Sequence, residues 1–275
     1  MLDYTQDPGL GSIRLLAVDM DLTLLADDGT QPPHMAEKIR ALDEAGVVFC
    51  AASGRPWPTL ALMFEDNMDR IGLCADNGAF AMYRGKTVFE DLLDPAVWHR
   101  GLAQASTDKR CVPTMCCFDH ATVLERDRGY EKELSKYYKD IRYVESFDTI
   151  DERSNKYSLF FPAYDAEEAF AEYYRPTYSG ELYVTNAGRE WIDFMNLGTS
   201  KGSGVGHLCE KLGISMCDVA AVGDTYNDIP LLEAAGHSFI VANAEKHMEA
   251  HATYRVPSNN DRGVATLIDA ILAAH

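Results

Sequence analysis

Residues 13–25 read IRLLAVDMDLTLL, and this stretch decides the fold. Its first half is an almost continuous apolar run, which predicts a strand buried on both faces of a parallel sheet. The run ends in Asp19 and Asp21, followed by Thr23. In open α/β sheets ligands bind beyond the carboxyl ends of the strands, and side chains two residues apart on an extended segment point the same way. The pattern therefore predicts two carboxylates facing one site. The alternative is an acidic turn after a core strand.

The composition narrows the class of protein. The chain has 275 residues, of which 47% are hydrophobic and 25% charged, as is usual for a globular protein with a sizeable core. Its net charge of −18 argues against nucleic acid or an anionic membrane as partner. The seven cysteines are scattered without a C-x-x-C pair, which favours a reducing compartment. Because we find neither a signal-peptide pattern nor an apolar stretch of membrane-spanning length, we expect a cytoplasmic protein.

The order of the predicted elements indicates two domains. Apolar strands recur near residues 47–52, 71–75, 218–222 and 237–242, and patterns with helical spacing lie between them. This alternation predicts an α/β fold with a doubly wound, Rossmann-like parallel sheet. Residues 83–187 have short strand pairs and polar helices instead, which predicts an inserted α+β domain. We therefore expect a core domain of residues 1–82 and 188–275, with a further short strand at 191–194.

Four polar clusters occupy equivalent places in this pattern: Asp19/Asp21/Thr23, Ser53, Lys201 and Asp224/Asp228. All except Lys201 directly follow an apolar strand, so we expect them to converge at one edge of the sheet. Together they contain what phosphoryl transfer requires. One carboxylate can attack phosphorus, a second can move a proton, and a lysine with Mg²⁺ can neutralise the phosphate charge. Hard carboxylate oxygens are ligands suited to Mg²⁺.

The chain resembles a known family in these clusters. DMDLT at 19–23, SGR at 53–55, TSKG at 199–202 and GDTYND at 223–228 resemble the four ordered motifs of the haloacid dehalogenase superfamily. NGA at 77–79 and SNNDRGV at 258–264 resemble its Cof-type (type IIB, C2-capped) phosphatases, which carry an α/β cap where the insertion lies. The resemblance implies a Mg²⁺-dependent phosphatase that hydrolyses a small phosphorylated metabolite, with a sugar phosphate favoured, through an aspartyl-phosphate intermediate.

The resemblance also assigns roles to individual residues. Asp19 would be the nucleophile, Asp21 the general acid/base, and Lys201 would steady the nucleophile and the phosphate. The residues implied at the phosphoryl group or the substrate are Thr23, Ser53, Gly54, Arg55, Asn77 and Asn227. The residues implied at the metal are Asp19, Asp21 through its backbone carbonyl, Asp224 and Asp228. Two of these have an alternative reading, because Asp228 is suited to cap the following helix and Arg55 to pair with a nearby acid.

One position departs from the family pattern. Leu22 stands where the family usually has glycine, so that the turn either tolerates a side chain or adopts a different conformation. Two other functions remain open from sequence: a phosphotransferase or phosphomutase with a similar core, and a non-catalytic phosphate-binding or phospho-acceptor module. The insertion of about 100 residues and the second acid at Asp21 favour turnover. A monomer or a weak dimer is compatible with the sequence.

Overall fold

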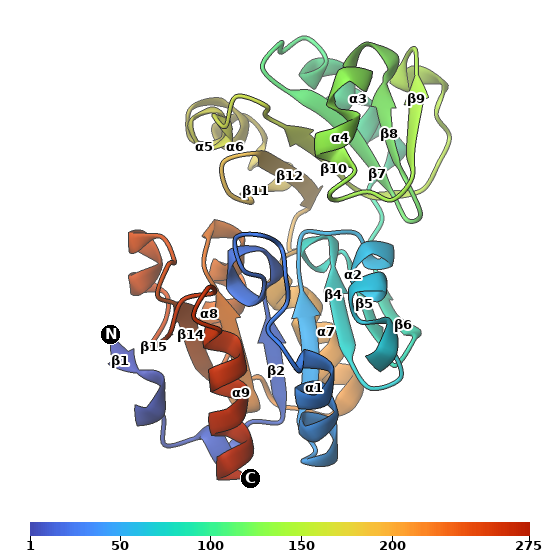
Figure 1. Cartoon of the computed structure of the whole chain (residues 1–275). Coiled ribbons are helices and arrows are strands. Elements are labelled where there is room, and N and C mark those ends of the chain that lie inside the picture. Colours follow the sequence, from blue (N-terminus) through green and yellow to red (C-terminus); the bar gives the residue numbers. More distant parts are fainter.

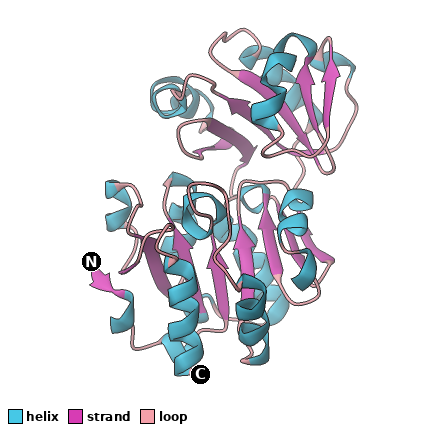
Figure 2. Ribbon diagram, viewed as in Figure 1, coloured by secondary structure: helices cyan, strands magenta, loops and turns pink.

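The computed structural model describes all 275 residues and contains two β-sheets (Figures 1 and 2). The larger sheet has nine strands, in the spatial order β1 (Leu2–Asp3), β15 (Tyr254–Val256), β14 (His237–Val241), β13 (Val219–Gly223), β2 (Leu15–Val18), β3 (Val48–Ala52), β4 (Gly72–Ala75), β5 (Phe80–Tyr83) and β6 (Lys86–Glu90). The pairings from β1 to β4 are all parallel, whereas β5 and β6 add an antiparallel edge. The predicted α/β fold class with a parallel sheet is confirmed.

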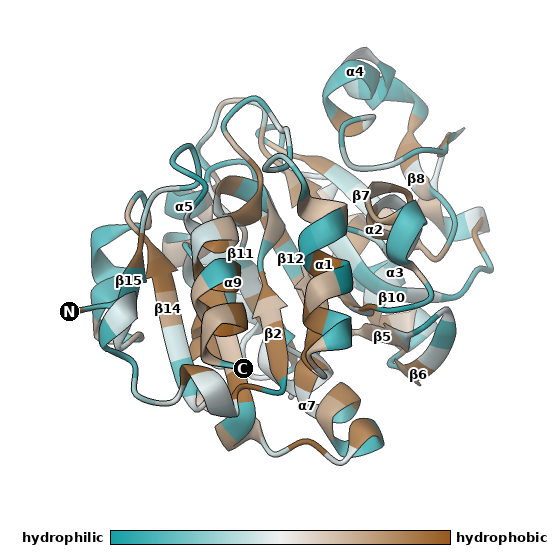
Figure 3. Ribbon diagram, turned by 60° about the horizontal axis from the view of Figure 1, so that its bottom comes forward, coloured by the Kyte–Doolittle hydropathy of each residue, from teal (hydrophilic) through white to brown (hydrophobic).

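Helices cover both faces of the larger sheet, as the parallel connections require. On one face lie α1 (Met35–Glu44), α2 (Trp57–Met63) and α9 (Gly263–Ala274), and on the other α7 (Lys201–Leu212) and α8 (Ile229–Ala234). Buried apolar residues of α1, α2 and α9 form one cluster with the sheet, and those of α7 and α8 form another. Figure 3 shows the hydropathy along the chain. Every residue of β2 is fully buried between the two helix layers, which explains why its sequence is apolar throughout. The carboxyl end of β2 is thereby fixed at the centre of the sheet.

The smaller sheet has six strands, in the order β11 (Leu182–Asn186), β12 (Trp191–Asn196), β10 (Ser154–Phe160), β7 (Val112–Cys117), β8 (Ala121–Leu124) and β9 (Ile141–Val144). All of its pairings are antiparallel except that between β8 and β9. Its helices are α3 (Pro95–Ala105), α4 (Glu131–Leu134), α5 (Ala166–Ala169) and α6 (Arg175–Tyr178), the last two joined by the helical turn Phe170–Tyr174. It lies beyond the carboxyl ends of the parallel strands (Figure 1).

Sheet membership differs from the expected boundaries at both ends of the insertion. Strand β6 pairs with β5 in the larger sheet, although residues 83–90 were expected in the insertion. The strand predicted at 191–194 is part of β12, which pairs with β10 and β11 in the smaller sheet rather than in the core. Strand pairing is a long-range property that the local pattern does not encode. We therefore propose residues 91–196 as the inserted domain and 1–90 with 197–275 as the core.

None of the helices combines the length and the apolar character that crossing a membrane requires. Short helical turns complete the chain at Tyr4–Gln6, Leu10–Ser12, Met20–Leu24, Glu65–Asn67, Asp76–Gly78, Glu125–Tyr130, Phe147–Thr149, Met216–Asp218, Tyr226–Asp228 and Lys246–Ala250. Three of them, at Met20–Leu24, Asp76–Gly78 and Tyr226–Asp228, directly follow β2, β4 and the end of β13. These three turns bring polar residues to the same edge of the larger sheet.

Candidate active site

A cavity of about 510 Å³ lies between the core and the inserted domain, beyond the carboxyl end of β2. Its core side includes seven of the predicted residues: Asp19, Asp21, Ser53, Gly54, Arg55, Asp224 and Asn227. Residues of the inserted domain form the opposite wall, among them Tyr137, Tyr138, Lys156, Arg189, Trp191 and Asp193. Cavities at domain interfaces and at the strand ends of α/β sheets are where small-molecule sites occur. The cavity is therefore the candidate active site.

Asp19 and Lys201 form the centre of this site. Asp19 follows β2 and is 5% exposed, and Lys201, the first residue of α7, is fully buried. The Lys201 ammonium donates to Asp19 Oδ1 at 2.5 Å and to Asp228 Oδ1 at 2.6 Å. The helix start is fixed by a reciprocal capping box between Ser200 and Ser203, which sets the place from which Lys201 extends. Lys201 thus joins the carboxylates that follow β2 and β13.

Asp228 and Thr23 orient the other carboxylates. Asp228 Oδ2 accepts the backbone N–H groups of Asp224 at 3.0 Å and Thr225 at 3.2 Å, which closes the turn after β13. A side chain at Gly223 is excluded there, because its Cβ would lie 2.5 Å from the Asp228 side chain. Thr23 Oγ1 donates to Asp224 Oδ1 at 3.0 Å. Asp228 therefore closes the turn before α8 and binds Lys201, whereas its side chain makes no cap hydrogen bond to α8 itself.

The acidic cluster has more negative charge than its protein partners neutralise. One ligand oxygen each from Asp19, Asp224 and Asp228 lies within 4.8 Å of the others, and all three residues are buried with only the Lys201 ammonium between them. Burial, reinforced by Asp228, raises the pKa of Asp19 to about 7 against the opposing effect of Lys201. Burial together with Asp19 likewise raises the pKa of Asp224 well above its usual range. This oxygen-rich donor set fits a divalent cation of the Mg²⁺ class.

Asp21 is held by Arg55 rather than by the acidic cluster. Arg55 Nε donates to Asp21 Oδ2 at 2.9 Å and Nη2 donates to Asp21 Oδ1 at 2.7 Å, a bidentate pair. The third contact of the guanidinium is with the inserted domain, where Nη1 donates to the Lys136 carbonyl at 3.0 Å and the group lies over the Tyr137 ring. The Asp21 side chain is about half exposed and lines the cavity. Two roles were considered for Arg55, a substrate contact and a pair with a nearby acid. The structure contains the ion pair.

The residues expected around the phosphate do not all face the cavity. Ser53, Gly54 and Asn227 line it. Thr23 and Asn77 do not: Thr23 is 1% exposed with its only hydroxyl proton engaged by Asp224, and Asn77 is also 1% exposed. In this structure neither residue is placed to contact a phosphate in the cavity, in contrast to the expectation from sequence. Each instead supports a neighbouring side chain of the site.

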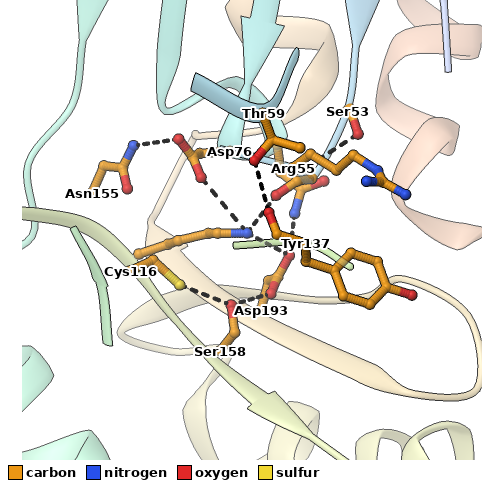
Figure 4. A network of polar contacts seen from close by, with 12 residues as sticks. Ser53, Arg55, Thr59, Asp76, Cys116, Tyr137, Asn155, Ser158 and Asp193 are labelled. Carbon is orange, nitrogen blue, oxygen red and sulfur yellow. Dashed lines mark hydrogen bonds and ion pairs between the residues drawn. The ribbon is translucent and has the colours of Figure 1, made fainter. Parts of the chain in front are cut away.

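Sequence reasoning missed a buried polar network between the two domains (Figure 4). Asn77 Nδ2 donates to Asp193 Oδ2 at 2.5 Å, and Asn77 Oδ1 accepts from Asn227 Nδ2 at 3.0 Å. Lys156 donates to the Gly54 carbonyl at 2.5 Å and to Asp193 Oδ2 at 3.3 Å. The available signal was a single charged residue in each of two strands, Lys156 in β10 and Asp193 in β12, since lone buried charges are rare. This network connects the inserted domain to the loop that carries Ser53 and Gly54.

Leu22 adopts the left-handed conformation that explains the usual glycine. Its φ is 58° and its ψ is 7°, and its side chain is 49% exposed at the cavity wall. A residue with a Cβ is destabilised by roughly 1–2 kcal/mol in the left-handed region of φ/ψ space. The turn after β2 therefore tolerates a side chain at a modest cost, and the conformation is the one that glycine would adopt.

Replacing Leu22 by glycine is expected to raise the free energy of unfolding by about 0.5 kcal/mol. The relief of backbone strain is partly offset because glycine gains entropy in the unfolded chain. Urea denaturation of the wild type and Leu22→Gly measures the difference. A loss of more than about 1 kcal/mol would contradict the strain argument and indicate that the leucine side chain is stabilising, as core-like packing would be.

The site thus combines two carboxylates that line a cavity between the domains, Asp19 and Asp21, with a buried lysine, Lys201, that donates to Asp19. Residues 16–268 match the family model of haloacid dehalogenase-like hydrolases, so the chain belongs to that family. It is 29% identical to an Escherichia coli 5-amino-6-(5-phospho-D-ribitylamino)uracil phosphatase, over 95% of this chain and 97% of the relative. It is 25% identical to an E. coli pyridoxal phosphate phosphatase, over 93% of this chain and 97% of that protein.

Solved structures agree with this assignment. A Streptococcus mutans protein is 25% identical, superposes with a TM-score of 0.86, and is matched over 95% of this chain and 99% of its own. A HAD/Cof-like hydrolase from Plasmodium vivax has the same fold, with a TM-score of 0.86 at 21% identity over 98% and 99% of the two chains. The predicted Cof-type family and its enzyme class, a phosphoric monoester hydrolase, are confirmed. The chain is therefore not the non-catalytic phosphate-binding or phospho-acceptor module that the sequence left open.

Proposed function

We propose that this hydrolase is a Mg²⁺-dependent phosphatase that acts through an aspartyl-phosphate intermediate. The observation that carries the proposal is Asp19, which lies at the end of the central strand with its carboxylate bonded to Lys201 at 2.5 Å and facing the cavity that Asp21 also lines. A carboxylate and a second acid in one cavity are the two groups that covalent phosphate hydrolysis needs.

In the first step an Asp19 carboxylate oxygen attacks the phosphorus of the substrate. The bond from phosphorus to the ester oxygen breaks, and Asp21, once it has left its pair with Arg55 and taken up a proton, gives that proton to the leaving oxygen. Lys201 holds the nucleophile through Oδ1 and places a positive charge beside the phosphoryl group. In the second step water attacks the phosphorus and gives its proton to the Asp21 carboxylate, and the bond to Asp19 breaks to release inorganic phosphate.

The Asp19 and Asp224 side chains would hold Mg²⁺. The family resemblance implies the Asp21 backbone carbonyl as a further ligand, and Asp228 would support the site through Lys201 and the Asp224 backbone. When bound, the ion would neutralise negative charge on the phosphoryl oxygens and on the buried carboxylates. Thr23 orients the Asp224 carboxylate by donating to Oδ1. Hydrogen bonds of this kind set the direction of metal-binding groups.

For the substrate we favour a sugar or polyol phosphate. The phosphate would lie against the Ser53 hydroxyl and the Gly54 N–H, and the rest of the molecule against the wall of the inserted domain. That wall combines the Tyr137 and Trp191 rings, 5.1 Å apart and edge to face, with the charged Arg189. It suits a polar chain attached to a planar group. The relatives named above act on a phosphoribitylamino-uracil and on pyridoxal phosphate, which have this character.

Phosphate release from a panel of phosphate monoesters tests the function. We expect release with Mg²⁺ present, loss of nearly all activity in excess EDTA, and recovery when Mg²⁺ is restored. The panel should include hexose and pentose phosphates, polyol phosphates, pyridoxal phosphate and the phosphoribitylamino-uracil. A rate that EDTA leaves unchanged would contradict the metal requirement. Formation of a new phosphate ester without free phosphate would identify a phosphotransferase instead.

A further inference from the structure

A second group of metal-ligating side chains lies in the inserted domain, outside the catalytic cavity. Cys117 ends β7, His120 follows in the turn to β8, and Glu152 precedes β10. One ligand atom from each, a sulfur, a ring nitrogen and a carboxylate oxygen, lies within 4.8 Å of the other two. Cys117 is a free, buried thiol and the His120 side chain is 1% exposed. None of the three lines the catalytic cavity.

The hydrogen bonding of His120 points its free nitrogen into this group. Nδ1 lies 2.7 Å from Asp119 Oδ1, and in the neutral tautomer that donates there the lone pair is on Nε2. Nε2 is buried, lies 2.9 Å from Glu152 Oε2, and has no partner with hydrogen-bond geometry. A lone pair facing a carboxylate at this distance is repulsive unless a positive charge lies between them. A carboxylate on the far nitrogen is also the usual partner of a metal-binding histidine.

The surroundings of the cluster are rich in negative charge. Asp119 and Glu152 lie on either side of the His120 ring. Arg142 is shared among three carboxylates, at 3.4 Å from Asp140 Oδ2, 3.7 Å from Glu152 Oε1 and 3.9 Å from Asp119 Oδ2. These carboxylates outnumber the arginine, which favours a bound cation at the cluster.

We propose that Cys117, His120 and Glu152 bind one transition-metal ion in the inserted domain. Zn²⁺ fits this set best, because thiolate, imidazole and carboxylate are its three protein ligand types, and water would fill a fourth position. The site differs in kind from the all-oxygen cluster at Asp19, where a hard ion such as Mg²⁺ is expected. It depends on residues that take no part in the proposed phosphatase chemistry.

The position of the site gives it a structural consequence. Phe118, between two of the ligands, packs edge to face on Phe80 of the core with ring centroids 6.1 Å apart. A small cavity beside it is lined both by residues 117–120 and by Pro56, Pro58 and Thr59 of the core. A metal ion would fix the turn that contacts the core near α2. Metal binding should therefore stabilise the contact between the two domains.

Cobalt binding in the presence of excess Mg²⁺ tests the proposal. Co²⁺ replaces Zn²⁺ in sites of this kind, and a Cys117 ligand should give a near-ultraviolet thiolate-to-cobalt charge-transfer band that the carboxylates of the catalytic cluster cannot give. We expect the band to saturate at one Co²⁺ per chain and to disappear when Zn²⁺ is added. Cys117→Ser should abolish the band, and His120→Ala should weaken Co²⁺ binding by about 100-fold or more.

Cys217→Ser is the matched control, because Cys217 is the one exposed cysteine, and it should leave the band unchanged. Circular dichroism in EDTA checks that the variants fold, and Glu152→Gln, at a partly exposed side chain, should weaken Co²⁺ binding even if Cys117→Ser does not fold. Co²⁺ binding without a charge-transfer band, or a band that survives in Cys117→Ser, would overturn the proposal. If Co²⁺ binds without a charge-transfer band, His120 would be an imidazolium held between Asp119 and Glu152.

Discussion

Replacing Asp19 by asparagine is expected to lower kcat for phosphate release by at least about 10³-fold, because the variant lacks the atom that attacks phosphorus. The geometry around position 19 should persist, since asparagine has the same shape and Lys201 keeps Asp228 as a partner at 2.6 Å. Steady-state phosphate release with the best substrate of the panel measures the loss. Asp69→Asn, at a carboxylate that is 74% exposed, is the matched control and should retain the wild-type rate.

Comparison with Asp21→Asn separates the nucleophile from the acid. An aryl phosphate such as p-nitrophenyl phosphate has a leaving group that needs little protonation. Because kcat/KM reports the first step, Asp21→Asn should lose less kcat/KM on it than on an alkyl phosphate. Asp19→Asn should lose activity equally on both substrates, because nucleophilic attack is required in each case. The same leaving-group dependence in both variants would contradict the roles assigned to the two residues.

The core of the site could be predicted because its residues follow buried strands directly. The apolar run of β2 fixes where Asp19 lies, and the same argument places Ser53 after β3 and Asp224 after β13. Lys201 was identified from its motif, and its place as the first residue of a capped helix brings it to the same edge. Where local periodicity determines an element, the element determines where its last residue points.

The remaining features depend on contacts between distant segments. Thr23 is one residue of a turn whose direction is set by the left-handed Leu22, and only the folded turn reveals that its hydroxyl meets Asp224. The wall formed by the inserted domain depends on how two sheets approach one another, so that Lys156 and Asp193 could not be assigned from their strands alone. The boundary strands β6 and β12 are determined by pairing partners far along the chain.

Replacing Lys156 by methionine is expected to lower the free energy of unfolding by about 3–5 kcal/mol at pH 8, because removing one partner of a buried ion pair leaves uncompensated charge. The Lys156 side chain is 3% exposed, and its ammonium lies 3.3 Å from Asp193 Oδ2 and 3.8 Å from Asp76 Oδ1. Urea denaturation measures the loss. Lys86→Met, at an exposed position in β6, is the control and should change stability little.

The pH dependence of this loss identifies its electrostatic origin. Burial raises the pKa of Asp76 to about 6 from its ordinary 3.8, although Lys156 opposes the rise. A carboxyl with a raised pKa in the folded state contributes stability that is complete below pH 3.8 and is lost as the pH rises through 6. Without Lys156 the pKa of Asp76 rises further, so the variant should lose more relative to the wild type as the pH increases.

The destabilisation by Lys156→Met should therefore be smaller at about pH 5 than at pH 8. Adding Asp193→Asn to the variant should restore part of the stability, since it removes one of the two unpaired charges, and the double-mutant cycle gives the coupling between the two residues. Equal losses at both pH values, with no recovery in the double variant, would mean that Lys156 acts through the packing of its aliphatic chain. The link between the inserted domain and the Gly54 loop would then be steric rather than ionic.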